Sequence, residues 1–260
     1  MQGALALLFG AAASVAGAAA AQEPGAQADA YFDREAMAAA RSSLRAEHGG
    51  GTNWFLLAER LEYQTNEGAS LLLFDGQGWW GTDRNKLWVK SEVERDFDAG
   101  RFEEAELQAL WSRPISRFFD IQAGVRQDFQ RGADRTFAVA GVQGLAPYWF
   151  EIDAAIFVSG DGDVSARFEA EYDLLLTQRL IIQPRTELNF AIQDVAEIGV
   201  GSGLSTAELG LRLRYEIRRQ FAPYVGVNWE RAVGETAEFA RSDGDDAGAV
   251  SAIAGVRLWF

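Results

Sequence analysis

Acidic side chains spaced two residues apart are the groups of this chain best suited to chemistry. The candidates for metal ligands are Glu151, Asp153, Glu169, Glu171, Asp173 and Glu187. Residues two apart share one face of a β-strand, so each of these segments would present its carboxylates to the same side. Carboxylate oxygens are hard ligands that suit hard or borderline cations. The pattern therefore predicts a cation path or a metal site, with no spacing specific enough to name a metal.

Basic side chains fall on the same faces, which leaves a second interpretation of these acids open. These basic residues are Lys90, Arg126, Arg167, Arg185, Arg212 and Arg214. Neighbouring strands can pair opposite charges, as where Glu169 and Glu171 would face Arg185 and Glu187. The alternative to a cation site is thus the salt-bridged wall of a water-filled lumen.

Soft metal ligands are scarce in the chain. It has no cysteine, one histidine (His48) and, apart from Met1, one methionine (Met37). Met37 and His48 are included as candidate metal ligands, and the alternative is an ordinary helix end. No enzymatic activity is predicted, because the single histidine precedes the first expected strand and no Gly-x-Ser-x-Gly motif occurs.

A two-residue alternation of apolar and polar side chains runs from residue 54 to the last residue. In residues 207–217, for example, Ala207, Leu209 and Leu211 alternate with Glu208 and Gly210. Segments of about 10 residues have the length that a tilted strand needs to cross a bilayer. The expected strands are 54–63, 70–80, 85–97, 101–112, 118–130, 135–145, 149–158, 163–175, 180–192, 203–217, 222–231 and 248–260.

This pattern predicts an all-β fold: a transmembrane antiparallel β-barrel of about 12 strands, with ten as the alternative. The chain ends on an aromatic, Phe260, in a strand with one apolar face, as outer-membrane barrels often do. The first strand is the least regular, because Glu59 or Arg60 breaks its alternation whichever way it is read. Short turns alternate with longer loops, which predicts both termini on the short-turn side.

Three segments divide the chain. Residues 1–21 resemble a signal peptide, with a retained membrane anchor as the alternative; residues 22–53 form a periplasmic linker and a short helix (31–47); residues 54–260 form the barrel. The formal net charge of -14 argues against a nucleic-acid partner, whose phosphates require a basic face. Outer-membrane lipid is the expected partner of the apolar face.

Nine stretches of the sequence resemble the copper resistance protein B family of outer-membrane proteins. They are residues 61–63, 85–90, 110–116, 119–126, 141–153, 169–180, 198–208, 209–217 and 221–231, and the resemblance extends over about 57–260. It implies location in the outer membrane of a Gram-negative bacterium and a role in copper tolerance beside a periplasmic multicopper oxidase. Copper ions are the implied cofactor. Typical members carry a methionine- and histidine-rich segment before the barrel, whereas residues 22–53 here hold only Met37 and His48.

The expected function is to pass or sequester copper ions at the outer membrane. A general diffusion porin is one alternative; it would show an open lumen and no preference for copper. A docking protein that holds the periplasmic oxidase through residues 31–47 is the other.

Overall fold

The structure, a computed structural model, describes residues 28–48, 51–66, 69–96, 101–129, 134–244 and 246–260. The chain divides into two compact units, Met1–Gly50 and Gly51–Phe260, and each is described by itself. The predicted signal peptide lies outside the described residues.

The described part of the N-terminal unit is helical. A short 3-10 helix, η1 (Ala28–Ala30), precedes α1 (Arg34–His48). The helix begins three residues later than predicted, because Asp33 caps it: its Oδ2 accepts a hydrogen bond from the backbone N–H of Ala36 at 2.9 Å. Arg41 holds Asp29 of η1 through two hydrogen bonds of 2.6 and 3.0 Å. No helix among the described residues is long and apolar enough to cross a membrane.

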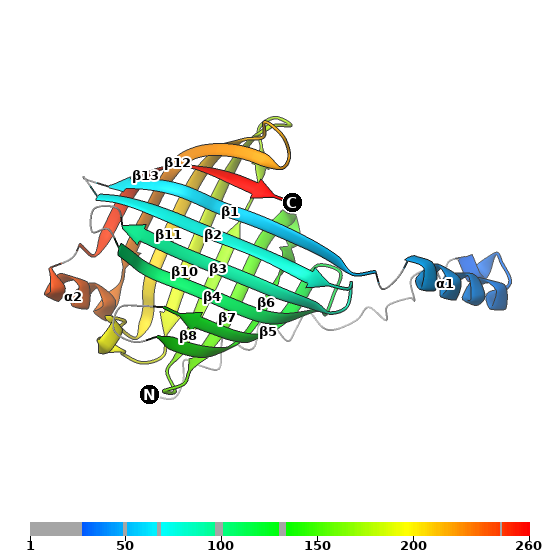
Figure 1. The fold of residues 1–260 in the computed structure, drawn as a ribbon, viewed down its shortest axis with the longest axis horizontal. Helices are drawn as coiled ribbons and strands as arrows, with labels where there is room; N and C mark the ends of the chain where they lie inside the picture. Colours follow the sequence, from blue (N-terminus) through cyan, green and yellow to red (C-terminus); the bar gives the residue numbers. More distant parts are fainter. Residues whose placement is uncertain (1–27, 49–50, 67–68, 97–100, 130–133, 245) are drawn as a thin grey trace. The chain divides into compact units, whose positions relative to one another are not determined.

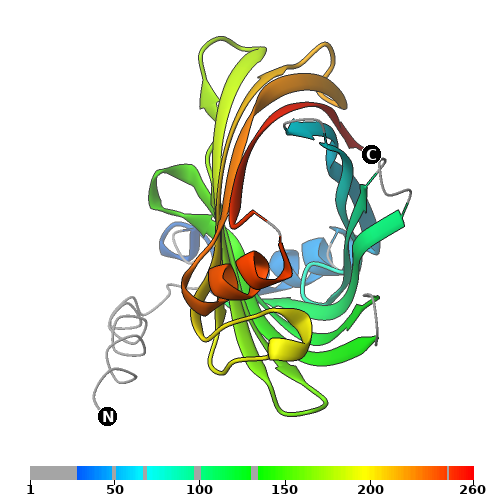
Figure 2. The ribbon, with the colours of Figure 1, turned by 90° about the vertical axis from the view of Figure 1, so that its left-hand side faces the viewer.

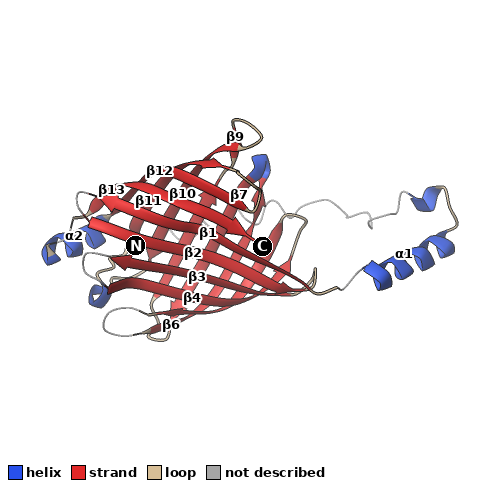
Figure 3. Cartoon of the chain, turned by 45° about the horizontal axis from the view of Figure 1, so that its top comes forward, coloured by secondary structure: helices blue, strands red, loops and turns tan. Residues whose placement is uncertain are grey.

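The second unit is a closed antiparallel barrel (Figures 1 and 3). Its strands are β1 (Asn53–Asn66), β2 (Ala69–Gly81), β3 (Lys86–Asp96), β4 (Arg101–Pro114), β5 (Phe119–Asp128), β6 (Arg135–Ala146), β7 (Phe150–Ser159), β8 (Val164–Glu171), β9 (Leu174–Leu175), β10 (Leu180–Ala191), β11 (Gly203–Tyr215), β12 (Phe221–Ala232) and β13 (Gly248–Trp259). Consecutive strands pair with each other, except that β8 and β9 both pair with β10, and β13 pairs with β1 to close the ring. The end view shows the strands following one another around this ring (Figure 2).

The barrel has 12 strand positions, as predicted, because β8 and β9 are one interrupted strand that pairs with β10 on both sides of the break. The break lies opposite Pro184 of β10. Tyr172 donates its backbone N–H to the carbonyl of Pro184 at 3.1 Å, but proline has no N–H with which to return the bond.

Connections at the two ends of the barrel differ in length, as the sequence predicts. The end that holds both termini of the barrel has tight turns, among them 82–85 and 115–118, and is called the turn end. The other end, the loop end, holds the longer connections 192–202 and 233–247. The second of these contains a helix that the sequence analysis treated as loop, α2 (Gly234–Asp243), which ends at Gly244 in a left-handed conformation (φ 89°).

The alternation of faces follows the sequence over most of the sheet, and the register also shifts between β3 and β4 at Glu94 and between β10 and β11 at Asn189. In β11, Leu209, Leu211 and Leu213 face outward and are exposed, whereas Arg212 and Arg214 face the lumen and are buried. Strand β1 carries a bulge, because its register with β2 shifts between Ala58 and Arg60.

Candidate functional site

The lumen of the barrel is divided into three cavities. The turn-side vestibule has a volume of about 420 Å³, the waist about 60 Å³ and the loop-side vestibule about 340 Å³. Acidic side chains outnumber basic ones in all three, by six to three, six to three and seven to three respectively. A lumen wall with this excess of carboxylates attracts cations and repels anions.

The strand register places acids directly opposite acids in two rows. The first acidic row crosses β2, β3, β4 and β5 and consists of Asp75, Glu92, Glu106 and Asp128. The second acidic row crosses β7, β8, β10, β11 and β12 and consists of Asp153, Glu169, Glu187, Glu208 and Glu230. Like charges directly opposite each other destabilise a sheet, so this arrangement needs compensating cations.

The candidate metal ligands occupy different parts of this lumen. Four of them line the turn-side vestibule: Glu151, Asp153, Glu169 and Glu171. Glu151 and Glu171 are direct cross-strand partners, and Glu171 also accepts a hydrogen bond from Gln183 at 2.7 Å. Within the part of the barrel that the structure describes, neither Glu151 nor Glu171 forms an ion pair with a basic side chain, unlike the other predicted acids.

The other predicted ligands lie apart from that vestibule. Asp173 forms an ion pair with Arg214. Glu187 lines the loop-side vestibule, 2.7 Å from Arg185 and 3.4 Å from Arg167. Met37 lies half-buried on α1, and the side chain of His48 lies outside the described residues. Among the residues that the structure describes, no group of three or more His, Cys, Asp or Glu side chains has the geometry to hold a metal ion.

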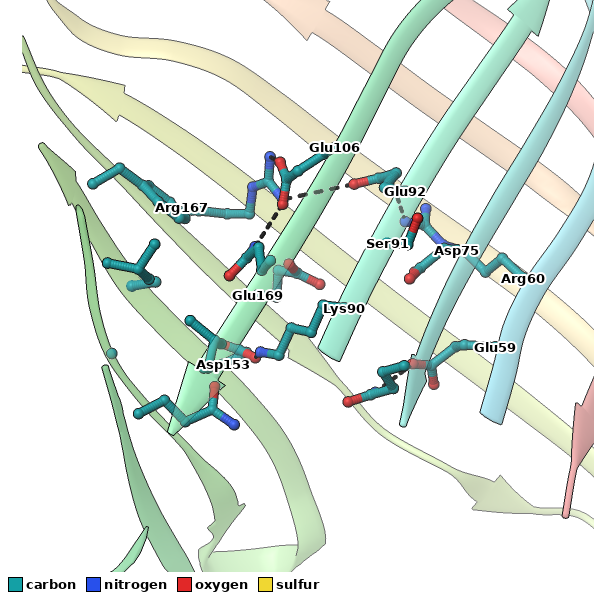
Figure 4. Close-up of a pocket in the computed structure, with 18 residues that line it drawn as sticks. Glu59, Arg60, Asp75, Lys90, Ser91, Glu92, Glu106, Asp153, Arg167 and Glu169 are labelled. Atoms are coloured by element: carbon teal, nitrogen blue, oxygen red, sulfur yellow. Dashed lines mark hydrogen bonds and ion pairs between the residues drawn. The ribbon is translucent and has the colours of Figure 1, made fainter. Parts of the chain in front are cut away.

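Two lysines reach acids within the turn half of the lumen. Lys86 of β3 contacts Asp120 of β5 at 2.8 Å, and Lys90 of β3 pairs with Asp153 of β7. The second pair spans the lumen rather than joining adjacent strands, and it lies at the waist (Figure 4). The predicted contact between Arg185 and Glu169 on adjacent strands is present at 2.7 Å.

Three arginines hold the acids at the waist and on either side of it. Arg60 contacts Asp75 at 2.9 Å and Glu92 at 2.8 Å, and Arg167 contacts Glu106 at 3.0 Å (Figure 4). Arg185 is the third, with contacts to Glu169, Glu187 and Glu208 of 2.7, 2.7 and 3.1 Å. The planar guanidinium presents five donors in a fork, so one arginine can satisfy several carboxylates at once.

The sequence analysis missed Glu59, Arg60 and Asp75 as lumen residues. All three line the waist (Figure 4). The bulge in β1 turns both Glu59 and Arg60 inward, and Arg60 then contacts Asp75 on β2. Two consecutive charged residues inside an otherwise alternating strand were the available signal, since only an extra residue in the strand can place both on the polar face.

One carboxylate at the loop end, that of Asp163, lies in a connection between two strands. Asp163, between β7 and β8, accepts hydrogen bonds from Gln193 at 3.0 Å and from Arg135. These bonds, that from Gln193 first, lower the pKa of Asp163 below its usual value. The carboxylate at this mouth therefore stays ionised to lower pH than an isolated aspartate.

Fold and lumen together define the class: a porin-like β-barrel. The fold matches that of the solved NanC porin with a TM-score of 0.51, at 12% identity, covering 79% of this chain and 99% of that one. Residues 52–260 match the family model described as copper resistance protein B precursor (CopB). The chain belongs to the copper resistance protein B family, as the sequence analysis predicted.

Two curated relatives support this assignment. One is the "Copper resistance protein B homolog" of Pseudomonas syringae pv. tomato (strain ATCC BAA-871 / DC3000), 46% identical over 228 residues, which are 88% of this chain and 76% of that protein. The other is "Copper resistance protein B" of Escherichia coli, 45% identical over 215 residues, which are 83% of this chain and 72% of that one. Family and fold support a role in copper resistance and an outer-membrane location, and they suggest a non-enzymatic protein.

Proposed function

We propose that the barrel passes copper ions across the outer membrane through its lumen. The carrying observation is the pair of acidic rows, which place nine carboxylates on nine of the 12 strand positions. All three of these cavities are acid-rich, so a cation meets a favourable potential in each of them. Membership of the copper resistance protein B family supports copper as the ion.

The oxidation state follows from the ligand chemistry of the barrel. Thioether and thiolate ligands select Cu(I), whereas carboxylates suit harder ions. Residues 51–260 contain no cysteine, methionine or histidine, and the lumen wall offers carboxylates and amides. We therefore propose Cu²⁺ as the ion that this lumen handles.

Passage accounts for the lumen better than the alternatives of storage and general diffusion. Two vestibules that meet at a common waist form a path rather than a closed store. A general diffusion porin requires an open channel, whereas the waist has a volume of about 60 Å³ and is crossed by ion pairs. In the usual orientation of such barrels the short turns face the periplasm, which would place residues 22–53 there as well.

A docking role for the N-terminal segment is the second candidate. Tyr31 and Phe32 before α1, and Leu44 on it, are exposed apolar side chains that could contact a periplasmic oxidase. Removing residues 22–51 separates the two roles. Docking predicts that binding of the oxidase is lost while copper passage through the barrel survives.

Copper flux into vesicles tests the proposed function. The full chain is reconstituted into liposomes that contain a dye quenched by Cu²⁺, and quenching is followed after Cu²⁺ is added outside. We expect flux above that of empty vesicles, with a several-fold reduction in Glu151→Gln/Glu171→Gln. Neither residue forms an ion pair in the described barrel, so the substitutions change lumen charge with little effect on folding.

The matched control is Asp83→Asn/Asp161→Asn, which removes the same charge from exposed connections outside the lumen. It should leave the flux unchanged. Flux no greater than that of empty vesicles, for a chain shown to be folded, would overturn the proposal.

A further inference from the structure

Three arginines and three glutamates of the lumen form a closed ring of ion pairs. Its contacts in order are Arg60–Glu92 2.8 Å, Glu92–Arg167 3.6 Å, Arg167–Glu187 3.4 Å, Glu187–Arg185 2.7 Å, Arg185–Glu208 3.1 Å and Glu208–Arg60 3.7 Å. Each glutamate is shared by two arginines. This set is called the ion-pair ring.

The ring connects strands that are far apart around the barrel. Arg60 lies on β1, Glu92 on β3 and Arg167 on β8, while the remaining members lie on β10 and β11. Strands β3 and β8 are separated by four others in the sheet, so the contact between Glu92 and Arg167 crosses the lumen (Figure 4).

Two of the arginines tie the two acidic rows together. Arg60 contacts Glu92 of the first acidic row and Glu208 of the second. Arg167 contacts Glu92 of the first row and Glu187 of the second. Each ring arginine also holds one further carboxylate outside the ring, from Asp75, Glu106 and Glu169.

The cross-links leave little room at the waist. With a volume of about 60 Å³, it is the smallest of the three cavities, against about 420 Å³ and about 340 Å³ for the two vestibules. The Arg60 side chain is only 3% exposed, although it lies in a lumen. A neutral solute would have to break ion pairs and offer no charge in exchange. An anion would in addition meet six carboxylates set against three arginines.

We propose that the ion-pair ring is the selectivity constriction of the lumen, which closes the barrel to neutral solutes and anions. A cation can take carboxylate oxygens from the arginines and so leave those oxygens paired, and a divalent cation does so more strongly than a monovalent one because of its higher charge. The cation part of this inference rests on the proposed function. The closure of the lumen by the ring does not.

Substituting lysine for arginine tests the ion-pair ring, because lysine keeps the positive charge but lacks the forked donors of the guanidinium. One ammonium cannot replace a guanidinium that contacts carboxylates on three strands. The full chain is reconstituted as wild type, as Arg60→Lys/Arg167→Lys and as Glu187→Gln, which removes the carboxylate shared by Arg167 and Arg185. The control is Arg257→Lys, at an inward-facing arginine outside the ring that contacts Glu59 at 3.9 Å.

Permeation of a neutral pentose is measured by liposome swelling. Single-channel conductance in KCl and Cu²⁺ flux are measured on the same preparations. Folding of each variant is checked by the heat-dependent shift of barrel mobility on a gel. We expect low pentose permeation for wild type and the control, and at least a five-fold increase for the double lysine variant and for Glu187→Gln.

The outcomes separate the two proposals. If wild type already passes pentose, or if both folded ring variants remain as impermeable as wild type, the ring is not the constriction. If the ring variants pass pentose while wild type shows no Cu²⁺ flux, the ring is confirmed as the closure and the proposed copper passage is overturned.

Discussion

Glu59 and Arg60 are consecutive residues of β1, and both side chains face the lumen. Regular strands send neighbours to opposite faces, so one extra residue must be accommodated between Ala58 and Leu61. The bulge therefore supplies Arg60 to the ion-pair ring without placing the Glu59 carboxylate in lipid.

Deleting Glu59 and deleting Ala58 should affect the folding of the barrel differently. Without Glu59, regular alternation still directs Arg60 inward, and we expect the barrel to fold. Without Ala58, alternation would direct Glu59 towards lipid, at a cost of up to about 2 kcal/mol for a charge on that face. The folded fraction in lipid vesicles, measured by gel mobility, should be clearly lower for the Ala58 deletion. Equal folded fractions would contradict this account of the bulge.

The most deeply buried ion pair joins Glu62 of β1 to Arg212 of β11 at 2.7 Å. Glu62 is 0% and Arg212 is 2% exposed. Breaking one partner of such a pair leaves an uncompensated buried charge, which costs roughly 3–5 kcal/mol. We expect Glu62→Gln and Arg212→Met each to lower the free energy of unfolding by about that amount in urea titrations followed by tryptophan fluorescence.

The double variant Glu62→Gln/Arg212→Met serves as the control for this pair. Because neither charge is then left alone, its loss of stability should be smaller than the sum of the two single losses. Additive losses would show that the two side chains do not stabilise the barrel as a pair.

Copper binding by calorimetry should show which segment carries the ligands. The proposal places Cu²⁺ among lumen carboxylates, so we expect Cu²⁺ binding to survive removal of residues 22–51 and to fall in Glu151→Gln/Glu171→Gln. Cu(I) should not bind the shortened chain measurably, since its barrel, residues 52–260, contains no cysteine, methionine or histidine. Loss of Cu²⁺ binding on truncation would instead assign it to the N-terminal segment, where Met37 and His48 lie.

The loop end should respond to pH through Asp194 and Glu235. The backbone N–H of Ser202 donates to Asp194 at 2.6 Å and lowers the pKa of that carboxyl. A hydrogen bond shared with Asp194, and the negative charge of Asp194, raise the pKa of Glu235 above its ordinary value of 4.5. The stabilisation from protonated Glu235 is thus complete below pH 4.5 and is lost as pH rises through the raised pKa. That from ionised Asp194 is present above its ordinary value of 3.8 and is lost as pH falls through its lowered pKa.

Contact of α2 with the loop that precedes β11 should accordingly be strongest in mildly acidic solution. Thr236 of α2 accepts a hydrogen bond from the N–H of Gly201 at 2.9 Å, so amide exchange at Gly201 reports this contact. We expect protection of Gly201, corrected for the intrinsic exchange rate, to decline above the raised pKa of Glu235. Glu235→Gln should remove that decline, and Asp246→Asn, an exposed acid beyond the helix, should not. If the protection of Gly201 declined equally in Glu235→Gln, another titrating group would be responsible for the decline.

The sequence by itself determined the barrel, its 12 strand positions, the face on which most side chains lie and the family. This is because the two-residue alternation of apolar and polar side chains indicates which face of a strand meets lipid, and this alternation can be read within each strand by itself. Leu209 and Arg212, for example, lie on the faces that their positions predict. The period fails only where a bulge adds a residue, as at Glu59 and Arg60.

Only the tertiary structure decided which charges meet. Glu169 and Arg185 lie on adjacent strands, so their contact could be predicted, whereas Arg60 and Glu208, or Glu92 and Arg167, come together only because the sheet closes. The register and stagger of the closed ring set which strands face each other across the lumen, and no single strand records them. The predicted acids are therefore inward, but their division between an open vestibule and an arginine-linked waist is a property of the closed barrel.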